Sequence, residues 1–168
     1  MSHAVVSLAT LAGITAGGIA MPVVDLMILK PTESLEIESI FKIWGIKKTK
    51  KTKDLLNLIV DLGTVSITGK TLVSSLKLIP GINLGAASIN AIISGTIVFA
   101  LGEAAAYIFE QIATGKKTVD DIEWAQKFLQ DSLSNTVLDK IAISAKNLSK
   151  NADKTEILDT VAQAFARG

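Results

Sequence analysis

The longest uncharged stretch of the chain, Leu78 to Gly102, most strongly limits what this protein can fold into. It contains no Asp, Glu, Lys or Arg and is rich in Ile, Ala and Gly. A helix of this composition is long enough to cross a bilayer, which takes about 20 apolar residues. The same pattern is typical of a helix buried on every side in a water-soluble bundle. A second uncharged run, Ala4 to Val24, precedes it, and we expect both runs to form helices of one glycine-rich core.

The composition favours an all-α protein over a β-sandwich. Of the 168 residues, 49% are hydrophobic but only 5% are aromatic, so the apolar character comes mainly from Ala, Ile, Leu and Val. Strand-rich domains usually contain more aromatic residues and threonine. We therefore predict a compact glycine-rich helical core domain, residues 1–115. Three C-terminal amphipathic helices, residues 116–168, are expected to form an extension packed on this core.

Small residues in the two uncharged runs have the spacing found where helices pack closely. Gly13 and Gly17 lie four residues apart in the first run, and small residues recur every seven positions in the second. Such a stripe lets the backbone of another helix approach. A glycine inside a helix costs about 1 kcal/mol relative to alanine, so contact is expected to compensate for it. The predicted helix-packing residues are Gly13, Gly17, Gly81, Gly85, Ser88, Gly95 and Gly102.

The shorter segments have the periodicity of amphipathic helices. Thr32 is the predicted N-cap of a helix that ends at Gly45, with Glu33 and Glu36 near its positive end. Leu55 to Leu62 is expected to begin a further helix, although the segment LNLIVDLGTVSIT, Leu56 to Thr68, also fits a hairpin.

In the last third of the chain, capping signals predict where helices begin. Thr118 with Asp121, and Asp153 with Glu156, have the spacing of capping boxes. The first box opens a helix that is expected to reach about Leu133. Another helix is expected between the two boxes.

The sequence contains no convincing enzymatic site. The segment GTVSITGKT invites comparison with a phosphate-binding loop, in which four residues separate the first glycine from Gly-Lys-Thr. Here Gly63 and Gly69 are separated by five residues. The chain has no cysteine, and its only histidine is His3 near the N-terminus, so neither a metal site nor a nucleophile with its base is expected. We predict a non-enzymatic protein without cofactor or metal.

Three acidic residues in apolar segments, Asp25, Asp61 and Glu103, are the remaining catalytic candidates, because a buried acid has a perturbed pKa. We expect each to pair with a residue such as Lys70 or Lys77, or to reach the surface. An enzyme would require one of them to face a partner across a pocket.

The segment KKTKKTK is predicted to be a basic loop. Near an anionic lipid surface each lysine contributes about 1 kcal/mol of attraction, and the neighbouring Trp44 is expected to be exposed. The alternative is a solvated loop. Nucleic acid is not an expected partner, because the net charge is only +1 and no aromatic residue interleaves with the lysines. The predicted contacts to an anionic surface are Lys47, Lys48, Lys50, Lys51 and Lys53.

Several motifs follow one another along residues 4–112 in an order that has a counterpart in a known family. They are Pro22 with Asp25, Trp44-Gly45, Gly69, Leu76 to Gly81, and Ala100 to Glu103. Together they resemble the glycine-rich helical domain of unknown function that accompanies bacterial Era-like and dynamin-like GTPases. The resemblance implies an all-helical domain, usually C-terminal to a GTPase, with suspected membrane association and no established enzymatic role. Two features depart from the family: the chain contains no GTPase domain, and Thr32 to Ile40 is rich in glutamate.

We therefore expect a helical interaction or regulatory module that works with a GTPase, at or near the cytoplasmic face of the membrane. The absence of cysteine is compatible with a reducing cytoplasm, and the N-terminus lacks the basic start of a signal peptide. A homo-oligomer is left open. The alternative is a bilayer-inserting protein that stays soluble until an apolar helical hairpin is released, as in pore-forming toxins.

Overall fold

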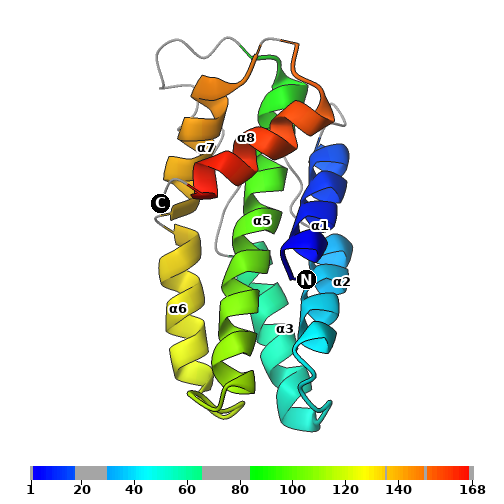
Figure 1. Ribbon diagram of the computed structural model, residues 1–168. Helices are drawn as coiled ribbons and strands as arrows, with labels where there is room; N and C mark the ends of the chain where they lie inside the picture. The colour runs from blue at the N-terminus through cyan, green and yellow to red at the C-terminus, as the bar shows by residue number, and fades with distance from the viewer. Residues whose placement is uncertain (1, 18–29, 66–83, 135, 150, 167–168) are drawn as a thin grey trace.

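The computed structural model describes residues 2–17, 30–65, 84–134, 136–149 and 151–166, and the statements below concern these residues. They form a bundle of α-helices without a β-strand in the described ranges, which confirms the predicted all-α class (Figure 1). The helices are α1 Ser2–Gly17, α2 Lys30–Ile43, α3 Lys50–Val65, α5 Ala86–Ala113, α6 Ile122–Ser134, α7 Thr136–Asn147 and α8 Lys154–Ala166.

Helix α5 runs along the length of the bundle and contacts every other described helix (Figure 1). Every residue from Asn90 to Gly102 is buried, as the uncharged run predicts. By length and composition α5 is the one described helix that could cross a membrane, and most of its apolar part lies inside the protein. The surrounding helices therefore account for its uncharged sequence, because a helix that is apolar on every side is stable in water only when other helices pack around it.

The amphipathic helices α6, α7 and α8 form at the predicted places and pack against α5. At α8 the Glu156 backbone N–H donates to Asp153 Oδ1 at 2.8 Å, so Asp153 caps the helix as predicted. The predicted capping box at α6 is wrong in register. The Asp121 carboxylate accepts a hydrogen bond from the Thr118 N–H at 2.6 Å, and the helix begins only at Ile122. Asp121 is thus the residue at the helix start rather than a residue of its first turn.

Helices α2 and α3 also differ in part from the sequence interpretation. Helix α2 begins at Lys30, so Thr32 lies inside the helix and is not its N-cap. Its end is as predicted, since Gly45 has φ +65°, a left-handed conformation that favours glycine. Leu55 to Leu62 lies within α3, so the helical prediction is confirmed for these residues, while the last three residues of the possible hairpin segment lie outside the described ranges.

Candidate functional site

Two glycines allow α1 and α5 to pack closely. A Cβ at Gly13 would lie 2.9 Å from Val98 Cγ2, and a Cβ at Gly95 would lie 2.6 Å from Ile14 Cγ1. Both distances are too short for a relaxed contact between carbon atoms, which is about 3.5–4.0 Å. Larger residues at either position would therefore push the two helices apart.

The other predicted packing positions differ in their surroundings. Gly85 precedes α5, and among the described residues no atom lies within 4 Å of its Cβ position, so it makes none of the predicted close helix contacts there. Ser88 is half-buried in the first turn of α5, and Gly17 is the last residue of α1. Gly81 lies outside the described residues. Sequence reasoning missed Gly63, which lies in α3 where a Cβ would come 2.6 Å from Leu101 Cδ2.

Gly102 provides space for a carboxyl group. A Cβ at this position would collide with Glu36 Oε1 and would lie 2.9 Å from Val6 Cγ2. The Glu36 side chain reaches from α2 into the space between α1 and α5, and only 2% of its surface is exposed. Neither carboxyl oxygen has a hydrogen-bond partner within the described part of the chain. A buried polar group without a partner is rare in folded proteins and marks this position for attention.

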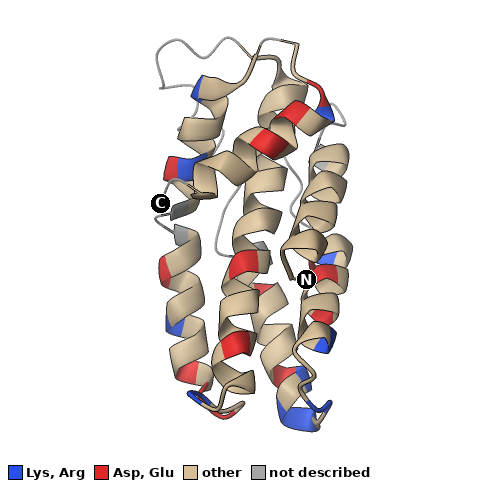
Figure 2. Ribbon diagram, in the orientation of Figure 1, with Lys and Arg blue, Asp and Glu red and all other residues tan. Residues whose placement is uncertain are grey.

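The surroundings of Glu36 favour its protonated form. Burial raises the pKa of its carboxyl group well above the ordinary value of 4.5, and the nearby charges of Glu33 and Glu103 raise the pKa further. Glu33 is also buried on α2, with 1% of its surface exposed. Glu103 of α5 faces the N-terminal helix, where its Oε1 lies 2.8 Å from His3 Nδ1. Helix α1 carries no acidic or basic residue other than this histidine (Figure 2).

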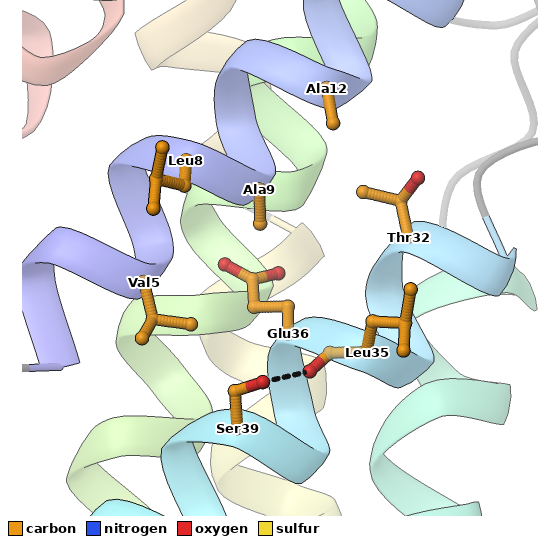
Figure 3. Close-up of a pocket in the computed structure, with 8 residues that line it drawn as sticks. All are labelled: Val5, Leu8, Ala9, Ala12, Thr32, Leu35, Glu36 and Ser39. Carbon is orange, nitrogen blue, oxygen red and sulfur yellow. Dashed lines mark hydrogen bonds between the residues drawn. The ribbon is translucent and has the colours of Figure 1, made fainter.

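Glu36 lines an open groove between α1 and α2 (Figure 3). The volume of this hollow, which we call the α1–α2 groove, is about 320 Å³. Each wall is a row of residues at positions i, i+3, i+4 and i+7 of its helix, which is one helix face. The lining residues are Val5, Leu8, Ala9 and Ala12 of α1, and Thr32, Leu35, Glu36 and Ser39 of α2.

Two leucines on the walls of the α1–α2 groove face solvent. Leu8 is 71% exposed and Leu35 is 70% exposed, the two most exposed of the large hydrophobic side chains described. Figure 3 shows them on opposite walls, with the Glu36 carboxyl group directed toward Ala9. Leu8 and Leu35 are therefore the large apolar side chains that a molecule entering the groove would meet.

A sequence signal for the buried glutamates existed but was not used. Glu33, Glu36, Ile37 and Ile40 have the spacing of one helix face, and all four are buried. We attributed the glutamates to the positive end of the helix, where acidic residues are favourable without burial. The spacing that assigned the isoleucines to the core applies equally to the two acids.

Two of the catalytic candidates are hydrogen-bonded to basic side chains, and the third lies outside the described residues. Asp61 accepts a hydrogen bond from Lys30 at 2.8 Å, and both side chains are largely exposed. Its partner is therefore Lys30, whereas the two lysines considered from the sequence lie outside the described ranges, as does Asp25. Glu103 pairs with His3 and is 33% exposed.

The basic segment is only partly a loop. Thr49 caps α3, since its Oγ1 accepts from the Thr52 N–H at 3.2 Å, so Lys50, Lys51 and Lys53 lie in the first helical turn. The five lysines are exposed, and Lys51 lies 2.6 Å from Asp120 Oδ1. The prediction that Trp44 is exposed is wrong. It packs against the core and its Nε1 is buried.

No protein-family model matches the chain, and comparisons with curated proteins and with solved structures give no match. The resemblance to GTPase-associated helical domains therefore stays a prediction. The function has to be argued from the α1–α2 groove itself.

Proposed function

We propose that this protein is a non-enzymatic interaction module that binds an amphipathic helix of a partner protein in the α1–α2 groove. The exposure of Leu8 and Leu35 on the two walls of the groove carries this proposal. Helix-in-groove recognition places apolar anchors at positions i, i+3, i+4 and i+7 against an apolar surface. The two walls of the groove are rows with this same spacing, so a helix lying over the groove would contact both rows.

The proposed partner is a GTPase, as the sequence resemblance implies. The groove itself supports a helical ligand and does not distinguish between classes of partner protein. The lysines at the start of α3 are proposed to strengthen this association at an anionic membrane face. The first turn of a helix carries a partial positive charge, which repels the positive charges of Lys50, Lys51 and Lys53. A nearby anionic surface would offset this repulsion (Figure 2).

A model peptide tests the helix-binding proposal before the partner protein is identified. The probe is a fluorescent peptide of about 18 residues, five helical turns, built from Leu, Ala and Gln with leucines at helical spacing. We expect saturable binding to the wild-type protein, measured by fluorescence anisotropy, with shifts of the Leu8 and Leu35 methyl signals in NMR spectra. A scrambled peptide of the same composition is the control ligand.

Substitutions at the groove complete the test. Leu8→Gln combined with Leu35→Gln should weaken peptide binding at least about tenfold while the helical circular dichroism spectrum is unchanged, because both side chains are already exposed. Leu138→Gln is the matched control, since Leu138 is 38% exposed on α7, outside the groove lining. Equal binding by the double variant and the wild type would refute the proposal, as would the absence of any binding.

The apolar character of α5 supports a second candidate function, insertion into a bilayer. This helix is long and apolar enough to span a membrane once the surrounding helices have separated from it. Dye-loaded liposomes of anionic lipid distinguish the two functions. Insertion predicts leakage that resists high salt, whereas peripheral attachment through the lysines predicts salt-sensitive binding without leakage.

A further inference from the structure

We propose that the helix bound in the α1–α2 groove carries a lysine or arginine among its apolar residues, and that this cation pairs with Glu36. The inference rests on the proposed helix-binding function and specifies what the groove recognises. Three observations carry it: the position of Glu36 in the groove lining, the lack of a partner for its carboxyl group, and the charges around it.

Within the described residues the carboxyl group of Glu36 lacks a hydrogen-bond partner, and in its ionised form both oxygens can only accept, so the ionised form requires a donor. Glu36 is 2% exposed and lines the groove, and the structure provides neither of its oxygens with a donor in the described ranges. Leaving such a group unpaired is unfavourable, so a ligand that brings a donor binds more tightly than one that does not. Hydrogen bonds between an ionised donor and a carboxylate are stronger than those between neutral groups.

The charges around the carboxyl group favour a positive donor over a neutral one. Glu33 on α2 and Glu103 on α5 act on Glu36, and both oppose its ionisation. The titratable group on α1 is His3, which is bonded to Glu103. A cation that enters this region is attracted by the charges of Glu33 and Glu103, and by Glu36 once its proton has left, whereas an anionic ligand would be repelled.

The carboxyl oxygens of Glu36 are buried next to Gly102, so a cation that pairs with them needs a long side chain. The wall around Glu36 consists of Val5, Ala9 and the neighbouring small residues of both helices (Figure 3). Lysine and arginine have apolar stems that pack along such a surface while the charged head reaches a polar group. The rest of the bound helix would cover Leu8 and Leu35.

Pairing of the cation with Glu36 requires a change in protonation. In the free protein the carboxyl group retains its proton to higher pH than an exposed glutamate does, because burial raises its pKa. When an ammonium or guanidinium group binds, the carboxyl proton leaves to the buffer and the carboxylate accepts hydrogen bonds from the cation. Binding below the raised pKa should therefore release a proton, up to one for each bound peptide.

Two peptides that differ at one central position test the inference. One carries lysine and the other norleucine, which has a similar chain length without the charge, in the same leucine-based helix. We expect the lysine peptide to bind the wild-type protein about tenfold more tightly than the norleucine peptide. Titration calorimetry in two buffers of different ionisation enthalpy should show proton release with the lysine peptide alone.

Variants on α2 test whether Glu36 causes the preference for the lysine peptide. Glu36→Gln should bind both peptides equally and release no proton, while Glu38→Gln, an exposed glutamate on the same helix, should behave like the wild type. If the wild type binds both peptides with equal affinity, the cation inference is refuted and helix binding stands. If neither peptide binds, the proposed function itself fails. Should Glu36→Gln not fold, the wild-type peptide preference and proton release still decide the inference.

Discussion

Substitution of Gly102 by alanine tests whether this glycine is needed to accommodate Glu36. The new Cβ would collide with Glu36 Oε1 and would also lie 2.9 Å from Val6 Cγ2. Overpacking of a core by a methyl group costs about 1–3 kcal/mol. Alanine is better than glycine inside a helix by about 1 kcal/mol, which opposes this cost. Gly102→Ala alone is therefore expected to change the free energy of unfolding by only about 0–2 kcal/mol, in the destabilising direction.

The decisive quantity is the coupling between the two positions, because the net effect of one substitution is small. In a Glu36→Ala background the carboxyl group is gone and the contact with Val6 Cγ2 remains, so Gly102→Ala should then be less destabilising than in the wild type. Urea unfolding of the four proteins in this double-mutant cycle gives the coupling energy directly. We expect about 1–2 kcal/mol, in the range found for residues in contact.

The cycle can also refute the reasoning. If Gly102→Ala has the same effect with and without the Glu36 side chain, the carboxyl group can move away from α5 at little cost. The glycine would then serve only the approach of α1. Gly85→Ala is the control, since a Cβ at Gly85 meets no atom of the described residues within 4 Å and should show no coupling to Glu36.

Three further predictions follow from single contacts. Burial raises the pKa of Glu36, so the native state keeps a proton that the unfolded state loses. The free energy of unfolding should therefore fall by about 1.4 kcal/mol per pH unit as the pH rises from 4.5 toward the raised pKa of the native state. Glu36→Gln should remove this slope in urea titrations at several pH values; a slope unchanged from wild type would contradict the assignment. Gly95→Leu should abolish the fold or greatly lower the Tm, because even a Cβ would lie 2.6 Å from Ile14 Cγ1, and an unchanged Tm would show that this helix face tolerates bulk. Asp153→Ala should cost about 1 kcal/mol through loss of the cap on the Glu156 N–H, measured by thermal unfolding, and no loss would mean that water replaces the cap.

The all-α fold and most of the helices could be predicted from the sequence alone. Apolar spacing located α6, α7 and α8, and the uncharged run from Leu78 to Gly102 indicated a helix covered on all sides. These features are local, because helical periodicity and capping depend on residues within a few positions of one another. For the same reason Gly45 could be recognised as a helix end.

The α1–α2 groove could not be predicted, because it depends on which helix faces lie opposite each other. The row that contains Leu8 and the row that contains Leu35 are separate short patterns in the sequence, and only the packing of α1 beside α2 brings them together. The partners of the glycines depend on packing in the same way. Gly95 meets Ile14 and Gly63 meets Leu101 across helix pairs that no local spacing specifies.

Glu36 shows most clearly what the sequence determined by itself and what only the tertiary structure decided. The sequence placed this residue on a helix, on the same face as Ile37 and Ile40. Whether that face meets solvent or another helix depends on contacts with α1 and α5, from segments far away in the chain. Burial beside Gly102 is what raises the pKa of the carboxyl group, since the free energy of an ionised group depends on the water and charges around it rather than on its neighbours in sequence.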